Sequence, residues 1–120
     1  MAELVVIEAN DALTHVALRG RLDLTGVSDV ELELTRQTVD RRKPAIVDIS
    51  AVDVLASIGV GMLVKNARWM HSHGLIFGVV ATGLSREILQ RLKVDTIFPV
   101  VPTYEEALRT LMLEWRRSAS

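Results

Sequence analysis

Cysteine is absent from this 120-residue chain, and aromatic residues make up only 4% of it. The lack of cysteine excludes disulfides, thiolate metal sites and thiol nucleophiles, and it fits a reducing cytosol. With so few aromatic rings, a buried core must be built mainly from valine, leucine, isoleucine and alanine. We therefore expect an intracellular domain with an aliphatic core.

The sequence also lacks an excess of positive charge and a long apolar run. Its formal net charge is −1, and apart from short runs at 41–43 and 116–117 the basic residues are scattered. No broad basic surface for nucleic acid is expected from this pattern. The start, MAELVVIEAND, has no basic leader, and no run of about eighteen apolar residues occurs. We expect a cytoplasmic protein without a membrane segment or a direct nucleic-acid partner.

The residues that are present predict a single α/β domain. Hydrophobic residues make up 49% and charged residues 24%, which is ordinary for a globular domain of this length. Two β-favouring runs at 4–7 and 13–18 flank the turn-forming Asn10 and Asp11, which predicts a hairpin. Strand-like runs then alternate with helical spacing. The pattern predicts a mixed sheet of four to five strands with about four helices packed on it.

Hydroxyl residues mark the expected helix starts. Ser28 and Thr103 are each followed three residues later by glutamate, which is the spacing of a capping box. Ser85 is expected to cap a short helix through Leu92, and Ser57 to cap a helix that runs to about residue 73. We expect each of these side chains to accept a hydrogen bond from the first turn of its helix.

Ser57 raises the possibility of catalysis, because it lies where the sequence changes from strand to helix. Hydrolases place a nucleophilic serine on such a turn between two glycines. Here Gly59 occupies the second glycine position, but Leu55 replaces the first. The three histidines fall in an early strand or at the far end of the helix that Ser57 begins. A serine hydrolase is therefore a remote alternative.

The sequence offers weak candidates for a metal site or for paired acid and base residues. His71 and His73 are two residues apart, a spacing that directs helical side chains to different faces. Asp23, Asp48 and Asp53 fall near predicted strand ends, where acidic residues commonly form turns and caps. We expect no metal and no cofactor.

A third possibility for Ser57 is phosphorylation. The first turn of a helix has free N–H groups and the positive end of the helix dipole, so a phosphate there is tolerated. The added charge of about −1.5 to −2 would change a partner's binding surface much more than the fold. This would make Ser57 a switch residue.

Two segments resemble the STAS domain of bacterial anti-sigma factor antagonists, also called anti-anti-sigma factors. They are GRLD at 20–23 and AIVDISAVDVLASIGVGMLVKNARWMHSHG at 45–74. In that family a strand ending in Asp-Leu-Ser leads through a loop to Asp-Ser-Ser-Gly-Leu-Gly and a helix closed by glycine. The element order resembles the family over nearly the whole chain, which implies a single STAS-like domain over residues 1–120.

The resemblance implies a protein-binding switch in place of an enzyme. Such domains bind an anti-sigma factor with serine kinase activity, free the sigma factor, and are inactivated when that kinase phosphorylates them. Ser57 matches the phosphoacceptor, Asp23 matches an acidic loop residue beside it, and Gly59 and Gly61 match the glycines that permit close approach. The kinase would bring its own ATP and magnesium.

The sequence departs from the family pattern on both sides of the acceptor. Ala56 replaces an aspartate, which removes a negative charge, and Ile58 replaces a serine or threonine, which makes the surroundings more apolar. Two interpretations stay open. Either the chain uses a different kinase, or Ser57 is an unmodified residue of a scaffold or ligand-sensing module.

The helix after Ser57 contains a candidate contact face. Ile58, Met62, Lys65 and Trp69 are related by steps of three or four residues and share one side of a helix. Tryptophan and methionine are common anchors at interfaces. We expect this strip to bind the partner, with the alternative that Trp69 tucks under a neighbouring helix.

Overall fold

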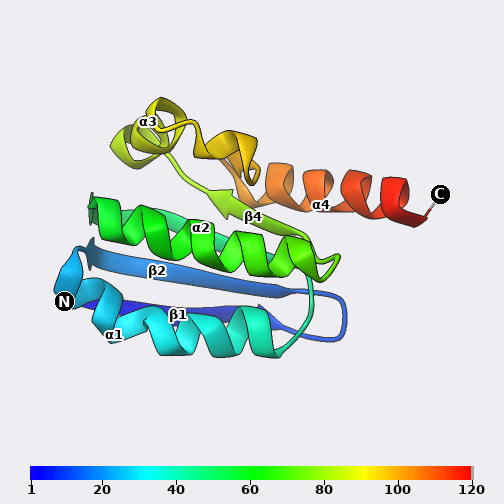
Figure 1. Ribbon diagram of the computed structural model, residues 1–120, viewed down its shortest axis with the longest axis horizontal. Helices are drawn as coiled ribbons and strands as arrows, with labels where there is room; N and C mark the ends of the chain where they lie inside the picture. The colour runs from blue at the N-terminus through cyan, green and yellow to red at the C-terminus, as the bar shows by residue number, and fades with distance from the viewer. Residues whose placement is uncertain (120) are drawn as a thin grey trace.

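The computed structural model describes the backbone of residues 1–119 and the side chains of residues 1–113 (Figure 1). The elements in chain order are β1 (Ala2–Ala9), β2 (Thr14–Leu22), α1 (Leu24–Thr35), η1 (Arg36–Asp40), β3 (Ala45–Leu55), α2 (Ser57–Ser72), β4 (Phe77–Val80), α3 (Gly83–Arg91), η2 (Val94–Thr96), β5 (Val100–Val101) and α4 (Tyr104–Ala119). η1 is a π-helical turn that continues α1, and η2 is a short 3-10 helix.

The strands form one mixed sheet in the order β1-β2-β3-β4-β5. β1 pairs antiparallel with β2, and the remaining neighbours pair parallel. The hairpin and the mixed α/β sheet predicted from the sequence are confirmed. β5 is a two-residue edge strand flanked by Pro99 and Pro102, residues that cannot donate a backbone hydrogen bond to a further strand.

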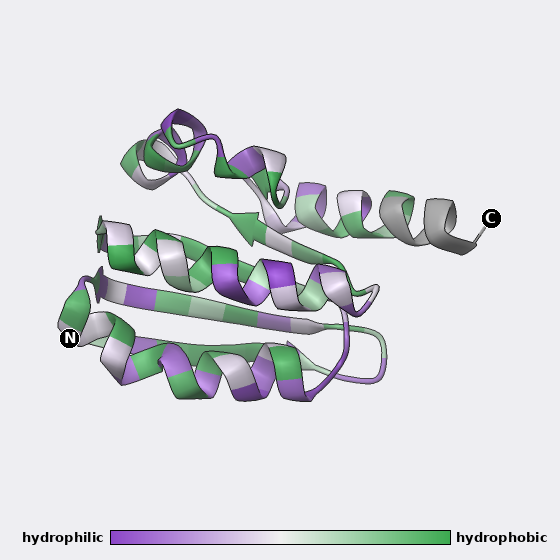
Figure 2. Cartoon of the chain, in the orientation of Figure 1, coloured by the Kyte–Doolittle hydropathy of each residue, from purple (hydrophilic) through white to green (hydrophobic). Residues whose placement is uncertain are grey.

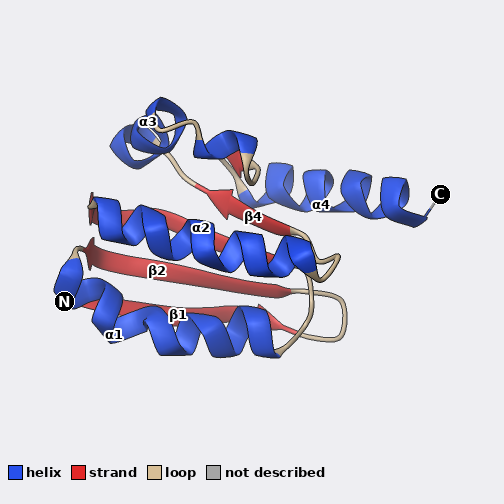
Figure 3. Ribbon diagram, in the orientation of Figure 1, coloured by secondary structure: helices blue, strands red, loops and turns tan. Residues whose placement is uncertain are grey.

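Helices cover both faces of the sheet (Figure 3). Val47 of β3 and Val79 of β4 belong to a core that also contains buried residues of α1 and α2. Ile46 and Val80, one position away on the same strands, pack with Ala107 and Leu111 of α4. Because successive strand residues point to opposite faces, α4 lies on the face opposite α1 and α2.

Three parallel strands are each followed by a helix at the same end of the sheet. β2 leads into α1, β3 into α2 and β4 into α3, and Figure 1 shows the arrows of β2 and β4 pointing to the left, the side on which these three helices begin. We call this side, where α1, α2 and α3 begin, the carboxyl edge of the sheet. It is the edge that carries Ser57.

Two element boundaries position the site, and the second corrects a sequence expectation. β3 extends to Leu55 because its register with β2 continues through two irregularities, so the strand ends two residues before Ser57. α1 begins at Leu24 with Asp23 as its N-cap, so Ser28 is an internal helical residue and not a cap.

The third helix also differs from its expectation. α3 begins at Gly83 after Thr82, and Ser85 is a buried residue within it. The helix ends at Arg91, and Leu92 is its C-cap residue. The cap predicted at Thr103 is confirmed, because its hydroxyl oxygen accepts a hydrogen bond from the Glu106 N–H at 3.2 Å.

Candidate functional site

Ser57 lies at the junction of β3 and α2, beside the junction of β2 and α1. Leu22 at the end of β2 is in register with Leu55 at the end of β3. The N–H of Ala56 donates to the Leu22 carbonyl oxygen at 3.0 Å. This hydrogen bond ties the two junctions together, so the chain turns into α1 at Asp23 and into α2 at Ser57 on neighbouring strands.

The start of α2 corrects the expectation that Ser57 is a cap. Ala56 is the N-cap residue, and Ser57 is the first residue of the helix. The Ala56 carbonyl oxygen accepts hydrogen bonds from the N–H groups of Gly59 at 2.9 Å and Val60 at 3.1 Å. No side chain caps this helix, because alanine has no acceptor atom. Ser57 is exposed at the surface, and its hydroxyl is free of the capping role.

The backbone at Gly59 lies close to the end of β2, whereas the backbone at Gly61 has free space around it. A Cβ atom at position 59 would lie 2.8 Å from the Leu22 carbonyl oxygen and 2.9 Å from the Leu22 Cβ. At Gly61, a Cβ atom would meet nothing within 4 Å. The expectation of close approach therefore holds for Gly59 and is wrong for Gly61. Gly59 lets α2 begin directly against the end of β2.

The Asp23 side chain caps the start of α1. Its carboxylate accepts hydrogen bonds from the Gly26 N–H at 3.0 Å and from Arg21 Nε at 3.2 Å. The Gly26 N–H, and after it the Arg21 guanidinium, hold the pKa of Asp23 below its ordinary value. Asp23 is therefore an ionised capping residue that shapes the neighbouring junction.

The predicted contact strip on α2 is interrupted. Ile58 is 42% exposed and Lys65 is exposed, but Met62 is only 3% exposed and belongs to the core. α1 packs alongside α2, so more than the sheet-facing side of α2 is covered. Met62 is therefore not available to a partner, and the expectation that it lies on a contact face is wrong.

Trp69 lies at the other end of α2 and is partly buried. It packs against the main core, and its ring stacks on the His73 imidazole with 3.8 Å between the ring centroids. The Arg42 guanidinium carbon lies 5.9 Å from the Trp69 ring centroid, which is a cation-π arrangement. These contacts engage much of the Trp69 ring within the chain.

No histidine is placed to serve Ser57 as a base. His71 lies fourteen residues along α2, which is about 21 Å at the rise of an α-helix. His15 lies seven residues before the end of β2, about 23 Å along an extended strand. It is buried, and its ring stacks on Tyr104 with 4.2 Å between centroids. The arrangement therefore lacks the hydrogen-bonded serine and histidine that nucleophilic catalysis needs.

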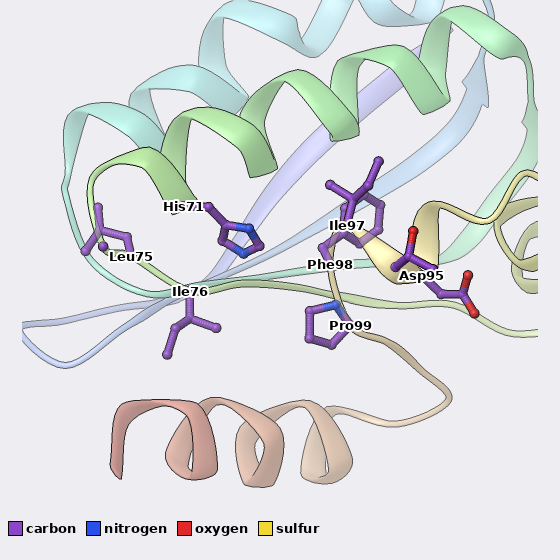
Figure 4. A pocket seen from close by; sticks show the side chains of 9 residues that line it. His71, Leu75, Ile76, Asp95, Ile97, Phe98 and Pro99 are labelled. Carbon is purple, nitrogen blue, oxygen red and sulfur yellow. The ribbon is translucent and has the colours of Figure 1, made fainter. Parts of the chain in front are cut away.

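Two hollows lie at the opposite end of the sheet from Ser57. One, of about 440 Å³, is shown in Figure 4, where His71 of α2 and Asp95 of η2 lie on either side of it. The other, of about 720 Å³, lies between the loop after α2 and α4, with Leu75 and Leu111 in its wall. Neither hollow includes a residue of the carboxyl edge.

Metal and membrane features were sought in the described part of the chain. There, no group of three or more histidine, aspartate or glutamate side chains is arranged to hold a metal ion. Within the same residues, no helix has the combined length and apolar character needed to cross a membrane.

The chain folds as a mixed five-stranded sheet flanked by four α-helices, and the helix after β3 begins with an exposed serine. The STAS domain model matches residues 5–107, and the chain therefore belongs to the STAS domain family. The sequence resemblance to this family is confirmed.

Two similar proteins are each described as an anti-sigma factor antagonist. The chain is 25% identical over 105 residues to the anti-sigma-F factor antagonist RsfB of Mycobacterium tuberculosis, which covers 87% of this chain and 85% of that protein. The crystal structure of an anti-sigma factor antagonist from Mycobacterium paratuberculosis superposes with a TM-score of 0.79 at 27% identity, over 93% of this chain and 95% of the other.

The fold is also shared with SpoIIAA. Its unphosphorylated form has a TM-score of 0.72 at 15% identity, over 92% of this chain and 96% of that chain. The phosphorylated form from Bacillus has a TM-score of 0.65 at 16% identity, over 92% and 98% of the two chains.

Proposed function

We propose that this protein is an anti-sigma factor antagonist. It binds an anti-sigma factor with serine kinase activity, and this binding releases a sigma factor. It acts by association and catalyses no reaction itself. Support comes from STAS family membership and from the similarity to RsfB and to the antagonist from Mycobacterium paratuberculosis. The distance of the histidines from Ser57 further supports a role that involves no catalysis.

Ser57 is the proposed phosphoacceptor, and one observation carries this proposal. Its side chain is exposed in the first turn of α2, while the capping position belongs to Ala56. In the proposed step the γ-phosphoryl group of the partner's ATP transfers to the Ser57 oxygen, the hydroxyl proton is lost, and ADP leaves. The product phosphate would lie at the positive end of the helix dipole, so the fold tolerates it.

The same modification weakens the complex. A phosphate adds about −1.5 to −2 charges and a bound shell of water beside Ile58, which is 42% exposed. Removing that charge from water is costly unless the partner supplies matching cations. Phosphorylation therefore switches the protein from a binding to a non-binding state.

Ala56 and Ile58 tune this junction. Alanine before the acceptor removes a carboxylate that would repel the phosphate, and it leaves the start of α2 without a side-chain cap. Ile58 and Lys65 are the residues of the predicted strip that remain well exposed. Both stay proposed partner contacts.

The test is intact-mass analysis after incubation with the anti-sigma kinase of the same organism, ATP and magnesium. We expect one added phosphate on the wild type and on the control Ser28→Ala, which removes an exposed helical hydroxyl, and none on Ser57→Ala. A phosphate that persists in Ser57→Ala would refute this site. Binding without any phosphate transfer would favour an unmodified scaffold, and labelling of Ser57 by an active-serine probe would favour a hydrolase.

A further inference from the structure

The larger of the two hollows, of about 720 Å³, lies at the end of the sheet opposite Ser57, and we call it the amino-edge pocket. Its wall is formed by the β1–β2 turn, by the segments that lead into β3 and β4, and by α4. In Figure 1 the β1–β2 turn and the loop after α2 both lie on the right. Pockets for small molecules have volumes of about 300–1,000 Å³. The larger side chains of this wall are aliphatic: Leu13, Leu75, Ile76, Leu108, Leu111 and Met112.

Backbone hydrogen bonds hold the base of the pocket in place. At the start of β2, the Thr14 N–H donates to the Pro44 carbonyl oxygen at 2.9 Å, and at the start of β3 the Ala45 N–H donates to the Ile76 carbonyl oxygen at 2.9 Å. Ile76 also packs with the buried residues of α4, toward which its side chain points in Figure 4. The segments and α4 are therefore fixed relative to one another, and the pocket is formed before a ligand arrives.

The wall of the pocket carries an excess of positive charge. It includes Arg42 and Lys43, and Asp11 is the one acid among the described residues that line it. The Arg42 guanidinium carbon lies 5.9 Å from the Trp69 ring centroid, so this cation is drawn toward α2. Lys43 is half-buried beside the aliphatic wall. Its ammonium favours an anionic ligand group, because partial removal from water strengthens the attraction between opposite charges.

We propose that the amino-edge pocket binds an aliphatic carboxylate, of the chemical class of a medium-chain fatty acid. The alkyl chain contacts the aliphatic wall between Leu75 and Leu108, and the carboxylate pairs with the Lys43 ammonium. With Asp11 also in the wall, a monoanion matches the charge better than a dianionic phosphate does. This inference goes beyond the proposed function, because it adds a small-molecule site at the edge of the sheet away from Ser57.

The test is a calorimetric titration of decanoate into the full chain at neutral pH, with octanoate and decanol as comparison ligands. Lys43→Gln removes the cation, and Met112→Gln makes polar a wall side chain that is 53% exposed. The matched control is Leu113→Gln, because Leu113 is 52% exposed at the next position of α4 and does not line the pocket. Circular dichroism and thermal unfolding verify that each variant is folded.

We expect decanoate to bind the wild type with a Kd below about 1 mM, and octanoate to bind about tenfold more weakly because it buries two fewer methylene groups. Lys43→Gln should raise the Kd for decanoate about tenfold and leave the Kd for decanol within about twofold. Met112→Gln should raise the Kd for decanoate about fivefold, and Leu113→Gln should leave it within about twofold.

Three results would overturn the proposal. The first is a wild type that does not bind decanoate, and the second is an equal Kd for decanoate in the wild type and Lys43→Gln. The third is self-association, measured by sedimentation velocity, that Met112→Gln abolishes and decanoate does not affect, because a second copy would then be the occupant. The titration contains neither the anti-sigma factor nor ATP, so its failure would leave the proposed function in place.

Discussion

The starts of α2 and α4 are built in opposite ways. At α4, the Thr103 hydroxyl accepts from the Glu106 N–H, two glutamates lie in the first turn, and Tyr104 stacks on the buried His15. At α2, Ala56 occupies the capping position, and neither a side-chain cap nor a first-turn acid is present. The start of α4 is stabilised by a side-chain cap, by acidic residues and by a ring contact, whereas the start of α2 has no side-chain cap.

The two helix starts differ in their side chains, because the backbone before α2 already has the geometry of a capping residue. Ala56 has φ −83° and ψ 167°, the extended geometry that capping residues adopt. A serine or aspartate there could satisfy an N–H group of the first turn. Natural proteins often forgo stability where a site must stay available to a partner. The open start of α2 is what we expect of a helix that presents Ser57 and Ile58.

A larger side chain at Gly59 should disrupt the junction of β3 and α2, and we expect it to have the largest effect on the free energy of unfolding. We expect Gly59→Val to lower the free energy of unfolding by about 2–3 kcal/mol, because the new side chain would overlap the Leu22 backbone. The measurement is urea unfolding followed by circular dichroism.

Gly61 provides the matched control within the same helix. A Cβ atom there meets nothing within 4 Å, so Gly61→Ala should raise the stability by about 0.5–1 kcal/mol through helix propensity. Equal losses in the two variants would contradict the distinction drawn between these glycines.

Removing the cap of α4 should have the next largest effect. Thr103→Ala deletes the acceptor of the Glu106 N–H, and we expect a loss of about 1 kcal/mol. Thr103→Ser keeps the hydroxyl and should stay close to the wild type in the same unfolding measurement. If both variants lose stability equally, the hydroxyl is not the source of the effect.

Adding a cap to α2 should have a smaller effect of opposite sign. We expect Ala56→Ser to raise the stability by about 0.5–1 kcal/mol, because its hydroxyl can accept from the first turn. In the double variant with Thr103→Ala the two changes should add, since the sites are far apart. A loss of stability in Ala56→Ser would show that the open start is not a vacant capping position.

The His15 contact at the start of α4 should respond to pH, with almost no effect at neutral pH. Burial lowers the pKa of His15 from its ordinary value of 6.5, while the charges of Asp48 and Glu8 oppose this. The unfolded chain therefore binds this proton more readily. The His15 contribution to stability is intact above about pH 6.5 and is lost as the pH falls toward the lower folded pKa.

His15→Phe keeps a ring against Tyr104 and removes the titration. The pH dependence of the unfolding free energy between about pH 7.5 and 5.5 should be shallower in this variant than in the wild type. Identical pH dependence in the two proteins would show that His15 is not the group responsible.

The alternation of strands and helices could be predicted from the sequence, because the spacing of apolar residues differs between a strand and a helix. Gly74 follows α2 with φ +71°, a conformation that glycine adopts without strain, which agrees with the glycine-closed helix of the resembled family pattern. The caps were less predictable. Ser28 matches the capping-box spacing as well as Thr103 does, but β2 ends at Leu22 and the cap falls to Asp23.

The exposure of the site residues depended on tertiary packing that helical spacing does not contain. Met62 has the spacing of a surface strip, yet α1 lies alongside α2 and Met62 is buried. Leu24 and Leu84 carry no distinguishing sequence signal. Their exposure follows from where α1 and α3 begin, at Leu24 and Gly83, which the spacing of apolar residues does not determine.

The central claim is that the carboxyl edge around Ser57 is a binding surface that phosphorylation switches off. The most direct measurement is the affinity of the anti-sigma kinase for the protein before and after complete phosphorylation of Ser57, with the modified site verified by mass analysis. The account expects the Kd to rise at least about tenfold on phosphorylation. Equal affinity of the two forms would contradict it.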